Sequence, residues 1–332
     1  MTQATGSFFF ALQTGWFFAI ILSVIILKGG IMNEFTWFSL ALIATFFWGL
    51  SDVTFKRGTD PDDPYSHLRI LIMIGIMMGI QAFFELYKLY SNGLTYSIRT
   101  GLIYFPISFL YILSMGVDFY GYRYLRISVG SPVASTSGAI AGLLAYKVLK
   151  KPMTGIQFFA IILIAVGLIA LAYMEHLDSK KEKLSKKEIA GMGAAAFIFP
   201  VTYAIVDSIA TFLDDVYLTK YLTEEEALIS FEMTFLIVAL IALFYLVVIK
   251  KQEYKLKNEK FNMLGGIFET AGQFFYVYAL SGNSVVSAPV MSLDGIVATV
   301  IGGIWLKEKL SKKQYATIAM IGVGVFILGF FE

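Results

Sequence analysis

Eleven apolar segments, each long enough to cross a lipid bilayer, constrain the fold of this chain more than any other feature of its sequence. A membrane-spanning helix needs roughly 17–25 mostly apolar residues. The sequence predicts such segments at residues 7–27, 35–55, 69–87, 100–118, 128–149, 155–174, 189–211, 227–249, 261–280, 284–306 and 314–331. Because hydrocarbon cannot satisfy backbone polar groups, spanning segments must be helices or strands of a closed barrel. None of these segments alternates in polarity as barrel strands do, so we predict an all-α membrane protein.

The composition agrees with a chain whose main solvent is lipid. Of its 332 residues, 58% are hydrophobic and 15% are charged, whereas soluble domains carry about 45–50% apolar and about 25% charged residues. The absence of cysteine and the presence of only two histidines exclude disulfides and Cys-based metal sites, and no HExxH motif occurs. We therefore predict no enzyme, no cofactor and no metal. The net charge of +2 comes from short basic runs between apolar segments, which do not indicate nucleic-acid binding.

The distribution of lysine and arginine predicts the orientation in the membrane. The loops on one side carry 19 of the 26 basic residues, and loops with an excess of Lys and Arg are cytoplasmic. This places the basic loops at 175–188, 250–260 and 307–313 in the cytoplasm and Glu332 outside, in the cell membrane. Two longer charged loops are predicted at 175–188 and 212–226, without a functional role.

An internal repeat organises the chain. The stretch from Ser131 matches the stretch from Ala288 without gaps at a shift of 157 residues, with 13 identities in 41 positions. The matched pairs include Pro132 with Pro289 and Gly138 with Gly295, and also Gln157/Gln314 and Gly167/Gly324. A looser match pairs Asp52 with Asp207. Each copy holds five predicted helices, an odd number, so the copies must have opposite orientations, as in many secondary transporters.

These matches predict three parts of the chain. Residues 35–174 and 189–331 form two inverted five-helix repeats, and residues 1–31 carry one extra N-terminal transmembrane helix. The extra segment lacks the basic leader and A-x-A-like cleavage site of a signal peptide. The sequence at Met32 also reads as a plausible chain start, so an upstream extension is the alternative.

The motifs "FFWGLSD" at 46–52 and "FYVYALSGNSVVSAPVMSLDGIVATVIGGIWLKEKLSKKQYATIAMIGVGVFIL" at 275–328, with the parallel stretch 119–171, resemble the drug/metabolite transporter superfamily of the EamA type. The resemblance covers residues 35–332. It implies a ten-helix bundle of two inverted five-helix repeats around a central cavity, and transport of small metabolites. The helix at 7–27 departs from the common pattern. So does Lys150-Lys151-Pro152, where the second repeat has Lys-Glu.

Acidic residues inside the apolar segments are the best candidates for the site, because an ionisable group at the centre of a membrane helix costs roughly 2.5–3.5 kcal/mol on insertion scales. Glu269 and Asp294 lie near the middle of their predicted helices, without a basic neighbour. For Asp52 and Asp118, ion pairs at helix ends with Lys56 and Arg123 are the alternative interpretation. Asp207 and Glu232 have no basic neighbour on their own helix, although a polar group on another helix could satisfy either.

Helical spacing places aromatic and polar side chains on the same faces as these carboxylates. The predicted substrate-binding residues are Asp294, Glu269, Trp48, Tyr203, Asp207, Gln273, Tyr276, Ser287 and Tyr111. The predicted candidates for proton coupling are Asp294, Glu269 and Glu232, because a carboxyl group in a low dielectric takes up a proton more readily than one in water. Ser137 is the repeat mate of Asp294, so one half alone carries a charge at that level.

We therefore predict a secondary-active transporter whose partners are the lipid bilayer and a small-molecule substrate. An acidic and aromatic cavity favours an organic cation such as an amine, through carboxylates and cation–π contacts. An exporter of amino acids or other neutral metabolites with the same fold is one alternative. A membrane accessory protein that does not transport is another.

Overall fold

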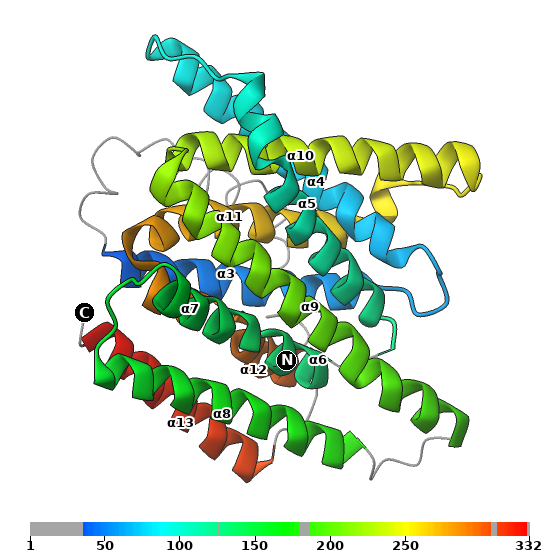
Figure 1. The fold of residues 1–332 in the computed structure, drawn as a ribbon. Coiled ribbons are helices and arrows are strands. Elements are labelled where there is room, and N and C mark those ends of the chain that lie inside the picture. The colour runs from blue at the N-terminus through cyan, green and yellow to red at the C-terminus, as the bar shows by residue number, and fades with distance from the viewer. Residues whose placement is uncertain (1–35, 125–126, 180–185, 307–310, 331–332) are drawn as a thin grey trace, which may run out of the picture.

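The computed structural model describes residues 36–124, 127–179, 186–306 and 311–330. This part of the chain is a bundle of helices (Figure 1), and no strand occurs within it. The elements are α3 (Trp37–Gly58), α4 (Ser66–Ser91), α5 (Ile98–Gly121), α6 (Ile127–Ala134), α7 (Thr136–Val148), α8 (Gly155–Ser179), α9 (Lys186–Lys220), α10 (Glu224–Phe244), η2 (Tyr245–Ile249), η3 (Leu256–Asn258), α11 (Lys260–Met291), α12 (Asp294–Trp305) and α13 (Lys312–Phe330). The predicted helix at 7–27 lies outside the described residues.

Several helices have the length and composition of membrane spans. Within the described ranges, five helical stretches are long and apolar enough to cross a bilayer: Trp37–Gly58, Ser66–Ser91, Ile98–Gly121, Glu224–Ile249 and Lys260–Trp305. Many large apolar side chains on their outer faces are exposed. Such surfaces are stable in lipid and unfavourable in water, which agrees with the predicted multi-pass membrane protein.

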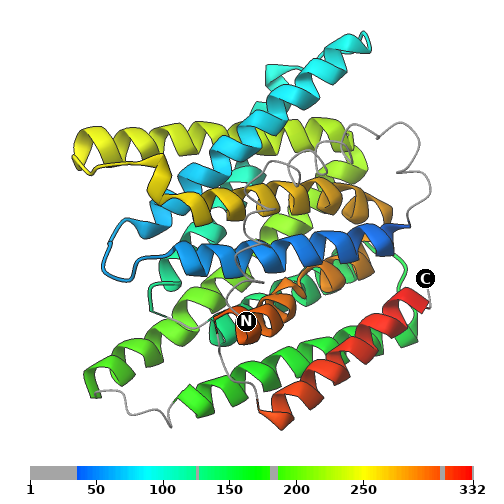
Figure 2. The same ribbon diagram turned by 180° about the vertical axis from the view of Figure 1, so that it is seen from behind.

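Corresponding helices of the two sequence repeats run in opposite directions. Figure 1 shows α3 antiparallel to α9, and α8 antiparallel to α13. Each helix packs against a partner from the other repeat: α3 contacts α11, α5 contacts α9, α4 contacts α10 and α8 contacts α13. Seen from behind in Figure 2, α8 and α13 form a separate pair on the side away from α4 and α10. This is the inverted arrangement that the odd number of helices predicts.

The identities between the repeats lie at reciprocal contacts. A Cβ on Gly138 would lie 2.2 Å from the carbonyl oxygen of Ala288, and one on Gly295 would lie 2.6 Å from the carbonyl oxygen of Ser131, the repeat mate of Ala288. Small residues at these positions let the helix backbones approach closely. The glycines that the two repeats share therefore lie where the backbones of the two halves pack against each other.

The same reciprocity holds at α8 and α13. A Cβ on Gly167 would meet Ile321, and one on Gly324 would meet Ile164, which is the repeat mate of Ile321. Both helices also begin with the same cap. Thr154 and Ser311 each accept a hydrogen bond from the backbone of the Gln three residues later, and the Gln side chain accepts one from the Thr or Ser backbone.

Two predicted helices are broken at equivalent positions. The segments at 128–149 and 284–306 were each expected to be one helix, and that expectation is wrong. Ser135 separates α6 from α7, and Ser292 with Leu293 separates α11 from α12. Pro132 and Pro289 lie three residues before Ser135 and Ser292, and a proline removes one backbone donor from the helix. Extended backbone at Asn283 also bends α11 (φ −161°) between its two predicted spans.

The helix at 189–211 extends beyond its predicted end. The charged run from 212 was expected to be a loop, but α9 continues to Lys220, and α10 starts at Glu224 behind a Thr223 capping box. Both Asp214 and Asp215 are buried in this extension. They find hydrogen-bond partners inside the protein, so their charges do not end the helix.

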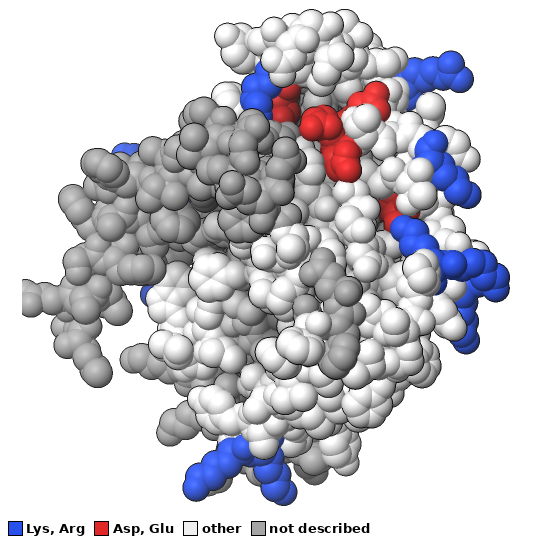
Figure 3. Space-filling model, turned by 90° about the vertical axis from the view of Figure 1, so that its left-hand side faces the viewer, with Lys and Arg blue, Asp and Glu red and all other residues white. Residues whose placement is uncertain are grey.

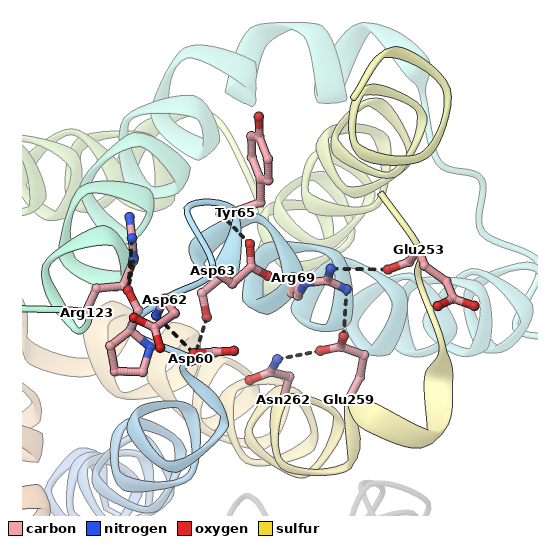
Figure 4. Close-up of polar contacts among 11 residues, drawn as sticks. Asp60, Asp62, Asp63, Tyr65, Arg69, Arg123, Glu253, Glu259 and Asn262 are labelled. Atoms are coloured by element: carbon pink, nitrogen blue, oxygen red, sulfur yellow. Dashed lines mark hydrogen bonds and ion pairs between the residues drawn. The ribbon is translucent and has the colours of Figure 1, made fainter. Parts of the chain in front are cut away.

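The helix ends on the right in Figure 1 are tied together by polar contacts (Figure 4). Arg69 at the start of α4 donates to Asp63 at 2.6 Å and to Glu259 at 3.1 Å. Glu259 also accepts from Asn262 of α11 at 2.7 Å, and Arg123 donates to the carbonyl oxygen of Pro61 at 3.0 Å. These contacts fix the loop between α3 and α4 against the ends of α5 and α11.

Candidate functional site

A cavity of about 70 Å³ lies in the interior between the two repeats. Water molecules need roughly 10–15 Å³ each by this kind of measure, so the space holds about five. Its acidic lining residues are Asp52, Asp118, Asp207, Glu269 and Asp294. Aromatic and amide side chains complete the wall, among them Trp48, Tyr111, Tyr203, Gln273 and Tyr276. No lysine or arginine of the described chain lines this cavity.

Most of the residues predicted from the sequence come together here. Eight of the nine predicted substrate-binding residues line the cavity. Ser287 does not: it is fully buried, and its hydroxyl oxygen has no hydrogen-bond partner in the described part of the protein. Glu232 of α10 is fully buried as well and lies outside the cavity lining.

Asp294 occupies the first position of α12, directly after the break at Ser292 and Leu293. The sequence placed it near the middle of a continuous helix, which is wrong because that helix is interrupted. A carboxylate at a helix N-terminus is favoured by the helix dipole. The break thus gives an acidic side chain in the interior of the bundle a local source of stabilisation, while the side chain still borders the cavity.

Two further carboxylates have hydroxyl partners. Ser51 of α3 donates to Glu269 at 2.8 Å and to the carbonyl oxygen of Gly265 at 3.1 Å, sharing its single proton between them. Asp52 accepts from Tyr122 at 2.7 Å. Hydroxyl groups can orient a carboxylate without neutralising its charge.

Trp48 and Tyr276 form one aromatic pair in the wall. Their ring centroids are 5.2 Å apart. Trp48 fits here because residue 272 is glycine, where a Cβ would lie 2.4 Å from the indole ring. The indole Nε1 of Trp48 and the amide Nε2 of Gln273 have no hydrogen-bond partner among the described protein groups.

Asp52 and Asp118 were missed as site residues. Sequence neighbours suggested ion pairs with Lys56 and Arg123, but both carboxylates line the cavity, and Arg123 donates to the backbone of Pro61. The repeat match of Asp52 with Asp207 could have identified the first. For Asp118, the shared face with Tyr104 and Tyr111 was the available signal.

Next to the cavity, a buried polar layer crosses between the repeats. Asp214 of α9 accepts hydrogen bonds from Tyr104 of α5 at 2.6 Å and from Tyr276 of α11 at 3.1 Å. The next residue, Asp215, forms an ion pair with Lys151 at 2.6 Å. Neither aspartate was predicted to have a role, because both were assigned to a loop.

The model of the EamA-like transporter family matches residues 35–173 and 200–330. A protein of Lactococcus lactis subsp. lactis (strain IL1403), named "Putative sugar uptake protein YxfA", is 25% identical over 302 residues, which cover 87% of this chain and 95% of that protein. A solved structure titled only "Crystal structure of protein" has the same fold, with a TM-score of 0.57 at 14% identity over 88% of this chain and 99% of that one.

The family match covers both halves of the chain and most of its length. It agrees with the two oppositely oriented sets of helices and with the interior cavity between them. The protein is accordingly a membrane transporter of a small molecule rather than an enzyme. The chain belongs to the EamA-like transporter family.

Proposed function

We propose that this protein is a secondary-active transporter of a small organic cation, such as an amine, in the cell membrane. Two five-helix repeats, residues 35–174 and 189–331, alternate access to the central cavity; the additional helix predicted from the sequence of residues 1–31 has no part in this argument. The observation that carries the proposal is the lining of the cavity. It combines five carboxylates with aromatic rings and holds no basic side chain of the described chain.

The electrostatic argument concerns how these carboxylates are compensated. A buried charge without a partner costs several kcal/mol, so it binds a counter-charge or takes up a proton. Asp294 and Glu269 border the same space as Asp52, Asp118 and Asp207, and like charges at close range cannot all remain ionised. A bound cation or a coupling proton on Asp294 or Glu269 relieves both costs.

Glu232 was a third candidate for the coupling proton. Because it lies outside the cavity lining, we do not assign it to the substrate site. Its full burial leaves it a candidate only for proton transfer elsewhere in the bundle.

The aromatic rings and the unpaired hydrogen-bond donors of the cavity narrow the class of substrate. Trp48 and Tyr276 present ring faces suited to an ammonium group, with cation–π contacts worth about 2 kcal/mol when desolvated. The N–H groups of Trp48 and Gln273 and the hydroxyls of Ser131 and Ser135 have no protein partner in the described chain. Unpaired donors favour a ligand that carries an acceptor oxygen. An amino alcohol or a hydroxylated quaternary amine satisfies both requirements.

The face at the left of Figure 1 supports a cationic substrate. Figure 3 shows a group of acidic side chains on this face. The first turn of α10, which begins at this side of the bundle, carries Glu224, Glu225 and Glu226. Acidic side chains on one face raise the local concentration of cations there.

A sugar is the second candidate substrate, and the observation that favours it is the name of the Lactococcus relative. Carboxylates and Gln273 can hydrogen-bond sugar hydroxyls, and Trp48 can stack on a sugar ring. An amino acid is a further neutral alternative. A neutral sugar does not compensate the negative charge of five carboxylates, however, so we place it second.

A thermal-shift screen of the purified protein separates these candidates. We expect choline and ethanolamine at saturating concentration to raise the unfolding temperature, because a ligand at a hundredfold excess over its Kd stabilises the folded state by about 2.7 kcal/mol. Glucose and neutral amino acids should leave it unchanged. Stabilisation by glucose alone would reverse the order of the two candidates.

A further inference from the structure

Asp214 is a buried carboxylate that has no role in the proposed substrate site. Its side chain is fully buried. Tyr104 of the first repeat donates to Oδ1 at 2.6 Å, and Tyr276 of the second repeat donates to Oδ2 at 3.1 Å. The carboxylate therefore bridges the two halves of the protein on one side of the cavity.

The charge of the neighbouring carboxylate, Asp215, is compensated by a basic side chain. Asp215 accepts from Lys151 at 2.6 Å through Oδ1 and from Ser284 at 2.8 Å through Oδ2. Asp214 has no such cation: the titratable groups that face it are Tyr104 and Tyr111 of α5, Tyr276 of α11 and Asp215 itself. In the described chain, no lysine or arginine makes an ion pair with Asp214. Among the described residues, a negative charge at this position is opposed by the charge of Asp215 and balanced by the hydroxyl dipoles of tyrosines.

Hydroxyl groups connect Asp214 to the cavity. The hydroxyl oxygen of Tyr276 lies 2.5 Å from that of Tyr111, and the hydroxyl of Tyr111 lies 3.0 Å from Oγ1 of Thr211. Tyr111, Thr211 and Tyr276 all line the cavity. A continuous chain of hydrogen bonds thus runs from the cavity wall to a buried carboxylate.

The number of protons on these hydroxyl groups limits which hydrogen bonds can exist at the same time. Each tyrosine hydroxyl has one proton to donate. If Tyr276 donates to Asp214 and Tyr111 donates to Thr211, no tyrosine proton remains for the 2.5 Å contact between the two hydroxyls. A proton on Oδ2 of Asp214 completes the chain, because Asp214 then donates to Tyr276, Tyr276 to Tyr111 and Tyr111 to Thr211.

We propose that Asp214 is a proton-binding site, loaded and unloaded from the cavity through the hydroxyls of Tyr276 and Tyr111. For loading, the hydroxyl of Tyr111 turns from Thr211 to Tyr276. A protonated group in the cavity then gives a proton to Tyr111, Tyr111 gives its own to Tyr276, and Tyr276 gives its own to Oδ2 of Asp214, so that one O–H bond forms for each that breaks; unloading is the reverse. Tyr104 holds the second carboxylate oxygen in both states. The inference rests on the proposed function in one respect: the proton bound here takes part in coupling to transport together with the carboxylates of the cavity.

The location of this site gives the proton a structural consequence. Ionised Asp214 accepts from one tyrosine of each repeat and ties α5 to α9 and α11. A proton on Oδ2 weakens this bridge, since a neutral carboxyl group binds hydroxyls less strongly than a carboxylate. The ion pair of Lys151 with Asp215 lies beside this bridge and also joins the two repeats. Protonation therefore loosens the contact between the repeats that alternating access must break.

Infrared difference spectroscopy of the protein in lipid tests the site without any substrate. Spectra at low and high pH report the carbonyl stretch of carboxyl groups that gain a proton. We expect Asp214→Asn to remove one such band that the wild type shows. The matched control is Asp215→Asn, which neutralises the adjacent residue and should keep the band. Tyr276→Phe retains the acid, removes one hydrogen bond, and should shift the band to higher frequency.

The outcomes are distinct. Identical pH-difference spectra for the wild type and Asp214→Asn overturn the proposal, because Asp214 then keeps one protonation state. If the Asn variant does not fold, the unshifted band of Tyr276→Phe overturns it as well. A band that responds to sodium at constant pH would identify a metal-cation site in place of a proton site. Since no substrate is added, a positive result stands even if the thermal-shift screen finds no amine.

Discussion

Asp294→Asn is expected to abolish gradient-driven transport while the protein continues to fold. The substitution keeps the shape of the side chain and removes its charge from a cavity that five carboxylates line. Leaving the charge of a buried ion pair without its partner costs about 3–5 kcal/mol, which corresponds to a loss of substrate affinity of roughly a hundredfold or more. Uptake of radiolabelled choline into proteoliposomes measures the effect, with circular dichroism and gel filtration to check the fold.

The matched control is Asp62→Asn, which removes a carboxylate from the exposed loop between α3 and α4. It should transport as the wild type does. If Asp294 carries the coupling proton instead of the substrate, the Asn variant stops accumulation under a proton gradient and still exchanges substrate across the membrane. Normal gradient-driven accumulation by Asp294→Asn would mean that this carboxylate has only a structural role.

The second large effect concerns stability. Gly138→Ala should destabilise the protein by about 1–3 kcal/mol or prevent its folding, because adding a methyl group to a tightly packed interface forces the backbones apart. The new Cβ would lie 2.2 Å from the carbonyl oxygen of Ala288 and 2.4 Å from Oγ of Ser292, both across the boundary between the repeats. Thermal unfolding in detergent gives the comparison.

Gly322→Ala provides the control in another helix, α13, since nothing lies within 4 Å of a Cβ at that position. Alanine favours helix formation over glycine by about 1 kcal/mol, so this variant should be as stable as the wild type or more so. Equal behaviour of the two variants would show that the backbones of the repeats do not pack as closely at Gly138 as described.

Much of the architecture could be predicted because lipid limits the options. Long apolar segments must be helices, and the gap-free match of glycine, proline and glutamine predicted two related halves. The structure explains these identities: Gly138 and Gly295 permit backbone contact between the repeats, and Gln157 caps α8 as Gln314 caps α13. Residues that a symmetric interface requires leave a readable pattern in the sequence.

What could not be predicted depends on contacts between distant segments. Hydropathy does not distinguish a continuous helix from one broken at Ser292, because both are equally apolar. Charge density suggested that Asp214 and Asp215 belong to a loop, but Tyr104, Tyr276 and Lys151 satisfy them from other elements. Neighbours in sequence likewise suggested a local ion pair for Asp118, which lines the cavity. A single sequence does not show these partners.

Counterflow into proteoliposomes tests most directly whether this cavity carries organic cations. Vesicles that contain the purified wild-type protein are loaded with an unlabelled amine from a panel of quaternary and primary amines, and the labelled form is added outside. The account predicts transient accumulation of at least one labelled amine, competed by other amines and not by glucose, and absent from protein-free vesicles. Exchange of labelled glucose, with no exchange of any amine in the panel, would contradict it.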